Sequence, residues 1–173
     1  MGTPRRPATE AEAKALASGV RLRIIRLCMD TALTNKEIAG RLDANPATTL
    51  HHVRTLVATG FLVPQEERRG PRGSREVPYR STGKSWTLDV QETTGGYGVA
   101  NQAMLDAFHD ELALVDIGTT DFARLGVRLT EEERDELSRR FSALLNEYLE
   151  RGPTPNGRPY SIFLAIYEDV SRP

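Results

Sequence analysis

Polar side chains of a few types recur at helical spacing between Pro46 and Thr59. One side of a helix over these residues carries Ala47, Thr48, His51 and Arg54, and the other side carries Thr49, Val53, Leu56 and Val57. A threonine hydroxyl or an imidazole can hydrogen-bond a base edge or a phosphate, and an arginine can contact guanine through two hydrogen bonds. Asn45 stands at the helix start, where free N–H groups attract phosphate. These residues therefore favour recognition of nucleic acid.

Two neighbouring residues have simpler interpretations. His52 lies about 100° around the helix from His51, which predicts packing at the edge of the core rather than contact with a ligand. For Arg54, an ion pair with an acidic neighbour remains an alternative to contact with a base.

A second set of basic residues follows in a glycine-rich stretch between residues 64 and 78. It contains Arg68, Arg69, Arg72 and Arg75. Arginines on a protruding loop favour contact with phosphates or the minor groove, which strengthens binding more than it selects a sequence. The alternative is an ordinary solvated surface loop.

The net charge of −1 conceals two halves of opposite sign. Residues 1–85 contain 15 Lys and Arg against 8 Asp and Glu, a net charge of +7, and residues 86–173 contain 8 against 16, a net charge of −8. This pattern is typical of a protein in which one part meets a polyanion. Because both sets of candidate contacts fall in the positive half, duplex DNA is the predicted partner.

Helix boundaries in the first half are marked by their capping residues. Thr9 with Glu12 and Thr34 with Glu37 each fit the capping box. The second box opens a short helix at 35–42, and Asn45 with Pro46 opens the next helix, which Gly60 ends. Two helices joined by three or four residues predict a helix-turn-helix.

A hairpin is predicted to follow this motif. Phe61–Val63 and Val77–Arg80 are the two strands, and Pro78 limits the return strand to an edge position. The order of elements predicts a winged helix-turn-helix over residues 9–86, within a DNA-binding domain at 9–92. Residues 1–8 are predicted to form a disordered basic tail.

Residues 97–173 are predicted to form a C-terminal region, which makes the fold class α+β. A dimerisation helix at 99–115 precedes a small strand-helix-strand unit. Alternating apolar residues predict a strand at 122–129, Thr130 with Glu133 opens a helix that reaches Glu150, and the apolar run at 160–167 predicts a buried strand.

The helix at 99–115 carries an apolar stripe with two interpretations. The stripe consists of Met104, Leu105, Phe108 and Leu112, and Phe163 is expected nearby. A palindromic DNA site requires two reading helices about 34 Å apart, so the first interpretation is the core of a homodimer. The second is a pocket for a small apolar effector, and both can hold at once.

At these residues the chain resembles the ArsR-type winged-helix regulators, in particular a subgroup with a longer wing. The resemblance covers residues 13–86 and is most specific at 18–25, 35–39 and 47–62. It implies a homodimer that places helix 46–59 in the major groove, usually as a repressor released by a signal. The chain departs from metal-sensing members, because it lacks their Cys-x-Cys and their clusters of Asp and His. No metal and no cofactor are therefore expected.

Several other classes of protein are disfavoured. No catalytic constellation or phosphate loop has a believable spacing, so an enzyme is not expected. The chain has neither a membrane-spanning apolar run nor a signal peptide, which predicts a cytoplasmic protein associated with the nucleoid. Cys28 lies on an apolar stripe and is predicted to be an inert core residue rather than a redox sensor. The remaining alternative is a winged helix that contacts only protein or RNA.

Overall fold

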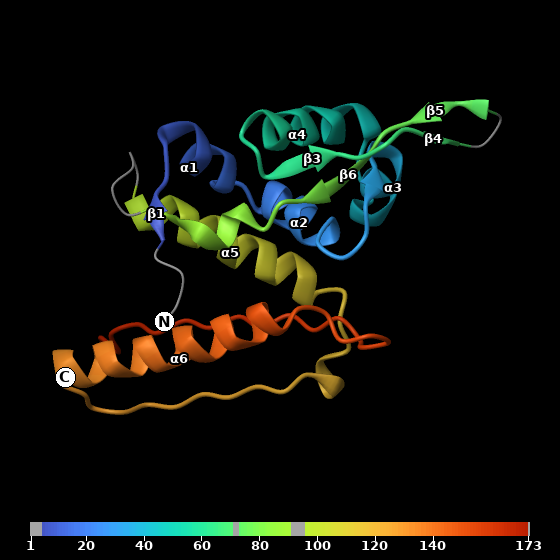
Figure 1. The fold of residues 1–173 in the computed structure, drawn as a ribbon. Helices are drawn as coiled ribbons and strands as arrows, with labels where there is room; N and C mark the ends of the chain where they lie inside the picture. The colour runs from blue at the N-terminus through green and yellow to red at the C-terminus, as the bar shows by residue number, and fades with distance from the viewer. Residues whose placement is uncertain (1–4, 71–72, 91–95, 173) are drawn as a thin grey trace. The chain divides into compact units, whose positions relative to one another are not determined.

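The computed structural model describes residues 5–70, 73–90 and 96–172. These residues divide into two compact units, the first ending at Leu114 and the second beginning at Val115. The helices of the first unit are α1 (Glu10–Leu16), α2 (Gly19–Leu27), α3 (Asn35–Leu42), α4 (Pro46–Ala58) and α5 (Gly96–Leu112). Its strands are β1 (Arg6–Pro7), β2 (Leu33–Thr34), β3 (Leu62–Pro64), β4 (Arg68–Arg69), β5 (Arg75–Glu76), β6 (Pro78–Ser81) and β7 (Leu88–Asp89), with a 3-10 helix at Lys84–Thr87 (Figure 1).

The order of α1, α2, α3, α4 and the β3–β6 hairpin is that of a winged helix-turn-helix. The predicted capping boxes are confirmed: the hydroxyl of Thr34 accepts from the Glu37 N–H at 3.2 Å, and the Glu37 carboxylate accepts from the Thr34 N–H at 2.7 Å. Helix α3 ends at Asp43, whose φ of 49° is left-handed. Asn45 then caps α4 through the N–H of Ala47 at 2.8 Å.

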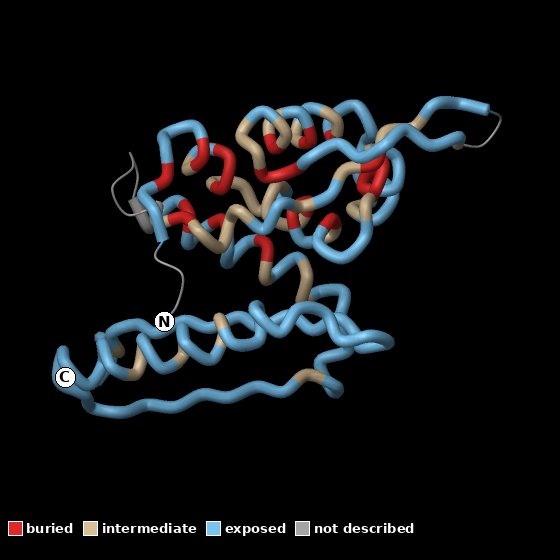
Figure 2. The backbone as a smooth tube through the Cα atoms, viewed as in Figure 1, coloured by how far each residue is buried: buried red, intermediate tan, exposed pale blue. Residues whose placement is uncertain are grey.

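The core of the first unit forms where α2, α3, α4 and β3 meet. Its largest side chains, each with at most 2% of its surface exposed, are Ile24, Ile38, Leu56, Phe61 and Leu62. Figure 2 shows this buried material on the inner sides of the helices, while the outer side of α4 is exposed. Burying an aliphatic or aromatic side chain of this size contributes about 1.5–3 kcal/mol, so the core fixes how α4 is rotated.

The wing differs from its prediction in one respect. The sheet has the order β2-β6-β3, so the return strand β6 lies in the centre and the predicted edge position is wrong. Pro78 is tolerated because it is the first residue of β6 and faces β2, a strand of only two residues. Its carbonyl still accepts from the N–H of Gln65 at 2.8 Å. Beyond this sheet, β4 and β5 extend the hairpin.

The start of the chain is more ordered than a basic tail would be. Strand β1 pairs with β7 in parallel, and the N–H of Ala8 donates to Asp89 at 2.6 Å. Arg6 forms an ion pair with Glu12 at 2.6 Å. The expected tail at 1–8 is therefore corrected for residues 5–8, because a distant strand and a buried carboxylate hold them, and residues 1–4 lie outside the described residues.

Helix α5 belongs to the first unit, whereas the sequence assigned it to the C-terminal region. Its small residues Ala100, Ala103 and Ala107 are buried, and Gly19 of α2 lies against Ala103 and Ala107. The attachment was missed because the larger side chains mark a different face of α5. Ion pairs from Arg23 to Asp110 and from Arg26 to Glu111, each 3.1 Å long, join α2 to the same helix.

The second unit contains one long helix, α6 (Glu131–Arg151), after a 3-10 turn at Ile117–Thr119. Thr130 forms its predicted capping box with Glu133. The strands predicted at 122–129 and 160–167 are wrong for the described residues 115–172, in which both segments are extended but lie outside any sheet. The alternating pattern at 122–129 and the apolar run at 160–167 are both typical of strands, but a strand also requires a paired neighbour.

The contact between α2 and α5 leads to a first prediction. A Cβ atom on Gly19 would lie 3.2 Å from the Ala107 nitrogen and 3.3 Å from the Ala103 oxygen, both of them backbone atoms. We expect Gly19→Gln to lower the free energy of unfolding by about 1–3 kcal/mol, as overpacking does. Urea denaturation measures this free energy. Gly40→Gln is the matched control, because nothing lies within 4 Å of a Cβ atom at that position. If the two variants were equally stable, the contact between α2 and α5 would be contradicted.

Glu12 leads to a second prediction, about pH. Its carboxylate, 8% exposed, accepts from Arg6 and from Lys84, each at 2.6 Å, and from the Thr9 N–H at 2.8 Å. The hydrogen bond from Arg6, followed by those from Lys84 and Thr9, holds the pKa of Glu12 well below its usual range against the effect of burial.

These bonds therefore stabilise the fold above the ordinary glutamate pKa of about 4.3, and the stability is lost as the pH falls towards the folded pKa. We expect Glu12→Gln to lower stability at neutral pH by about 2 kcal/mol and to weaken its dependence on acidic pH. Denaturant titrations at several pH values measure this. Glu10→Gln, at an exposed position of the same helix, should change neither, and an unchanged acid profile in the Glu12 variant would contradict the assignment.

Candidate nucleic-acid interface

Helix α4 presents its two faces as its sequence predicts. Thr49, Val53 and Leu56 are at most 1% exposed, and the Thr49 hydroxyl donates to the Asn45 carbonyl at 3.0 Å. The predicted contact residues of this helix are all exposed: Asn45, Ala47, Thr48, His51 and Arg54. Because the inner face of α4 is fully buried, the outer face is held in a fixed orientation. Recognition of a fixed pattern of base edges requires such an orientation.

Asn45 has a structural role in addition to its exposure. Its side-chain oxygen is occupied by the N–H of Ala47, and the Asn35 amide donates to the Pro46 carbonyl at 2.9 Å. The first turn of α4 is thus held by its own cap and by the first residue of α3. The sequence identified the Asn45 cap. It did not identify the hydrogen bond from Asn35, because that bond depends on how α3 and α4 pack together.

The three polar and basic residues beyond the cap are open to solvent. Among the residues that the structure describes, Arg54 forms no ion pair, so the alternative of an acidic partner finds no support there. The rings of His51 and His52 meet edge to face, with their centroids 5.9 Å apart. His52 is half-buried, and burial, with smaller contributions from Arg21 and His51, lowers its pKa. At neutral pH His51 faces outward and His52 packs beside the core.

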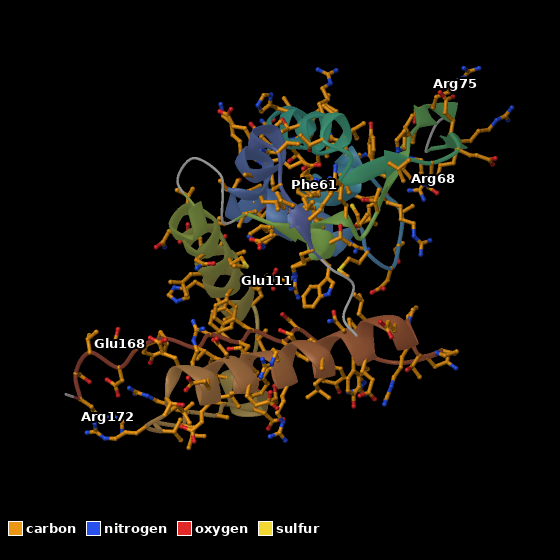
Figure 3. The ribbon with its side chains drawn as sticks, turned by 60° about the vertical axis from the view of Figure 1, so that its left-hand side comes forward. Phe61, Arg68, Arg75, Glu111, Glu168 and Arg172 are labelled. Atoms are coloured by element: carbon orange, nitrogen blue, oxygen red, sulfur yellow. The ribbon has the colours of Figure 1, made fainter. Side chains whose placement is uncertain are left out.

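The wing arginines divide into different roles. Arg68 forms an ion pair with Glu37 at 2.5 Å and lies 3.9 Å from Glu76. Arg75, with 87% of its side chain exposed, is 3.7 Å from Glu67. Figure 3 shows Arg75 further along the wing than Arg68. Arg69 is exposed and has no ion pair among the described residues, whereas Arg72 lies outside them.

Glu37 therefore connects the wing to the helix-turn-helix. The same carboxylate caps α3 through Thr34 and binds Arg68 on β4. The Thr34 N–H, followed by Arg68, lowers the pKa of Glu37 below its usual range, so the group stays charged near neutral pH. Sequence reasoning missed this pair because 31 residues separate its members and neither carries a local signal of the other.

Helix α5 exposes the apolar face that was predicted for a dimer or a pocket. Met104 and Leu105 are 45% and 38% exposed, and Phe108 and Leu112 are partly buried. Phe163 lies in the second unit and is 41% exposed. A shallow hollow on the first unit, lined by Ser18, Gly98 and neighbouring residues of α2 and α5, includes none of the five.

Other kinds of site find no support in the described residues. No three His, Cys, Asp or Glu side chains in that part of the chain gather closely enough to hold a metal ion. Cys28 is fully buried, and burial raises the pKa of its thiol to about 11, so it is protonated at neutral pH and packs as a core residue. None of the helices described is both long and apolar enough to cross a membrane.

Comparisons with known proteins give only distant likenesses. No protein-family model matches the chain, and a search of curated proteins gives no match. Among solved structures, it is similar to reduced HlyU from Vibrio cholerae at 20% identity, covering 55% of this chain and 80% of that one with a TM-score of 0.36.

It is also similar to a mutant of ZitR from Lactococcus lactis at 20% identity, covering 76% of this chain and 75% of that one with a TM-score of 0.33. A further likeness is to the homodimeric winged helix-turn-helix DNA-binding domain Mb0332 from Mycobacterium bovis, at 27% identity, covering 58% of this chain and 76% of that one with a TM-score of 0.32. Because these scores are below 0.5, the winged helix-turn-helix assignment rests on the order and pairing of the elements described above.

Proposed function

We propose that this chain is a sequence-specific DNA-binding regulator of transcription, with α4 as its reading helix. The observation that carries the proposal is the division of α4 into a fully buried face and an exposed face bearing Thr48, His51 and Arg54. A helix about 10–12 Å across fits the major groove, which is about 12 Å wide. Exposed polar side chains on a rigid helix supply the hydrogen bonds that distinguish base pairs in that groove.

The wing supports the same proposal through its charge and its attachment. The pair of Arg68 with Glu37 ties β4 to α3, and Asn35 ties α3 to the start of α4. The wing and the reading helix are therefore held in one framework. Arg69 and Arg75 are exposed beyond that tie, where they can neutralise phosphates beside the groove.

We further propose that the regulator acts as a homodimer on a palindromic site. Two copies of α4 must be held about 34 Å apart for this, and α5 offers a surface for the contact. Its small residues are used against α2, whereas Met104 and Leu105 remain exposed. We assign this face first to dimer contact, and a pocket for a small apolar effector is the second use that we propose for it. Repression is the mode that the resemblance to ArsR-type regulators implies.

Selection of duplex DNA from a random pool tests the reading helix. We expect an enriched palindrome, and we expect Arg54→Ala to cost about 1–3 kcal/mol of binding free energy and to relax the preference at one base pair of each half-site. Thr48→Ala and His51→Ala should weaken the same site. Lys14→Ala on α1 is the control, since that side chain is exposed and lies outside α4 and the wing. Absence of enrichment would favour a protein- or RNA-binding module instead.

The two neighbouring wing arginines should respond differently to salt. Arg69 is proposed to contact a phosphate, so Arg69→Ala should reduce the slope of log affinity against log salt by about one. The charge of Arg68 is already neutralised by Glu37, so Arg68→Ala should weaken binding with little change in slope. Fluorescence anisotropy at a series of salt concentrations measures both. Equal changes in slope would show that Arg68 also binds phosphate.

A further inference from the structure

The second unit leaves most of its apolar side chains in solvent. Between residues 115 and 172, all of which the structure describes, no residue is buried. The most exposed large apolar residues are Phe122, Leu125, Tyr160, Ile162, Tyr167 and Val170, at 64% to 89%. A chain without a core cannot offset the entropy that folding costs. This unit therefore needs a further surface to cover it.

Two extended segments of the unit are suited to strand pairing. Residues 121–130 and 158–168 both run back along α6 (Figure 1), and neither belongs to a sheet. The first segment alternates apolar residues at Leu125, Val127 and Leu129, and the second is an almost continuous apolar run from Tyr160 to Tyr167. Segments of this kind present backbone N–H and C=O groups along an edge to which another strand can add.

The exposed apolar area of the second unit is of the size that one partner of a dimer buries. At about 150–250 Å² for a large side chain, the six residues at 64% to 89% exposure present apolar surface on the order of 1,000 Å². A stable interface buries about 800 Å² on each partner. The area matches one partner's share of a stable interface.

The charges around the apolar surface suit a second copy of the same chain. An open hollow of about 530 Å³ between the first segment and α6 is lined by leucines and valine, with Glu132 towards one end and Arg140 towards the other. Neither of these two side chains forms an ion pair among the described residues. A two-fold axis repeats every contact in reverse, so a surface with both signs at opposite ends is complementary to itself.

We propose that the second unit completes its fold with the second unit of another copy of this chain. The extended segments pair as strands between copies, their apolar faces form a shared core with α6, and Glu132 of each copy meets Arg140 of the other. This inference rests on the proposed homodimer and extends it, because it adds a contact distinct from the exposed face of α5. The second unit then acts as an obligate dimerisation module.

Hydrogen exchange of the full-length protein, combined with light scattering, tests the proposal. We expect the mass of a dimer and slow amide exchange across residues 121–130 and 158–168. A dimer in which these amides exchange at the rate of an unfolded chain would overturn it. A monomer with slow exchange at the same amides would also overturn the proposal, because the first unit of the same chain would then cover the two segments.

Charge reversal on the exposed surface of α6 sharpens the test without disturbing a core. Glu132→Arg or Arg140→Glu should each reduce protection of the two segments by about tenfold, because like charges then meet twice across the axis. The double variant should restore protection. If none of the three variants changed the protection of the two segments, the Glu132–Arg140 contact and the proposal would both be contradicted.

DNA selection by the same proteins separates this inference from the proposed function. Slow exchange with no enriched DNA sequence would refute the regulator and keep the dimerisation module, whereas an enriched site with fast exchange would do the opposite.

Discussion

Burial of one face of α4 is the constraint on which the rest of the first unit depends. Val53 and Leu56 enter a core with Ile24, Ile38 and Phe61, all of them at most 1% exposed. Because α4 is held from three sides, by α2, α3 and β3, its rotation about its own axis is fixed. The exposed face is therefore determined by packing, and its polar residues Thr48, His51 and Arg54 lie in solvent, where a partner can reach them.

Ion pairs connect the core of the first unit to its outer segments. Glu12 forms ion pairs with Arg6 and Lys84 and caps the start of α1. Lys84 also donates to the Thr59 carbonyl at the end of α4, at 2.5 Å. Glu37 does the same for the wing through Arg68. In both cases a capping glutamate serves twice, once for its own helix and once for a distant segment. Each glutamate therefore helps to hold a segment outside the core, residues 5–8 in the case of Glu12 and the wing in the case of Glu37.

Local signals predicted much of the first unit. The capping boxes, the Asn45-Pro46 start and the helical spacing of apolar residues gave α3 and α4 within one residue of their observed ends. The exposure of Thr48, His51 and Arg54 followed from the same periodicity.

Features that depend on distant partners could not be predicted in this way. The two-residue strands β1, β2 and β7 exist only through their pairing, and the central place of β6 comes from β2. The contact of α5 with α2 depends on alanines and Gly19, which give no hydrophobic pattern. In the second unit, the strands predicted at 122–129 and 160–167 are absent from the described sheets, since a strand requires a paired neighbour that the sequence does not name.

The most direct test of the account is an NMR titration of the isotope-labelled protein with a duplex selected from a random pool. The account predicts that amide shifts change most at residues 47–54 and in the described parts of the wing, while the buried positions Val53 and Leu56 keep their mutual contacts. Large changes on another surface, with α4 unaffected, would show that the helix-turn-helix does not read DNA.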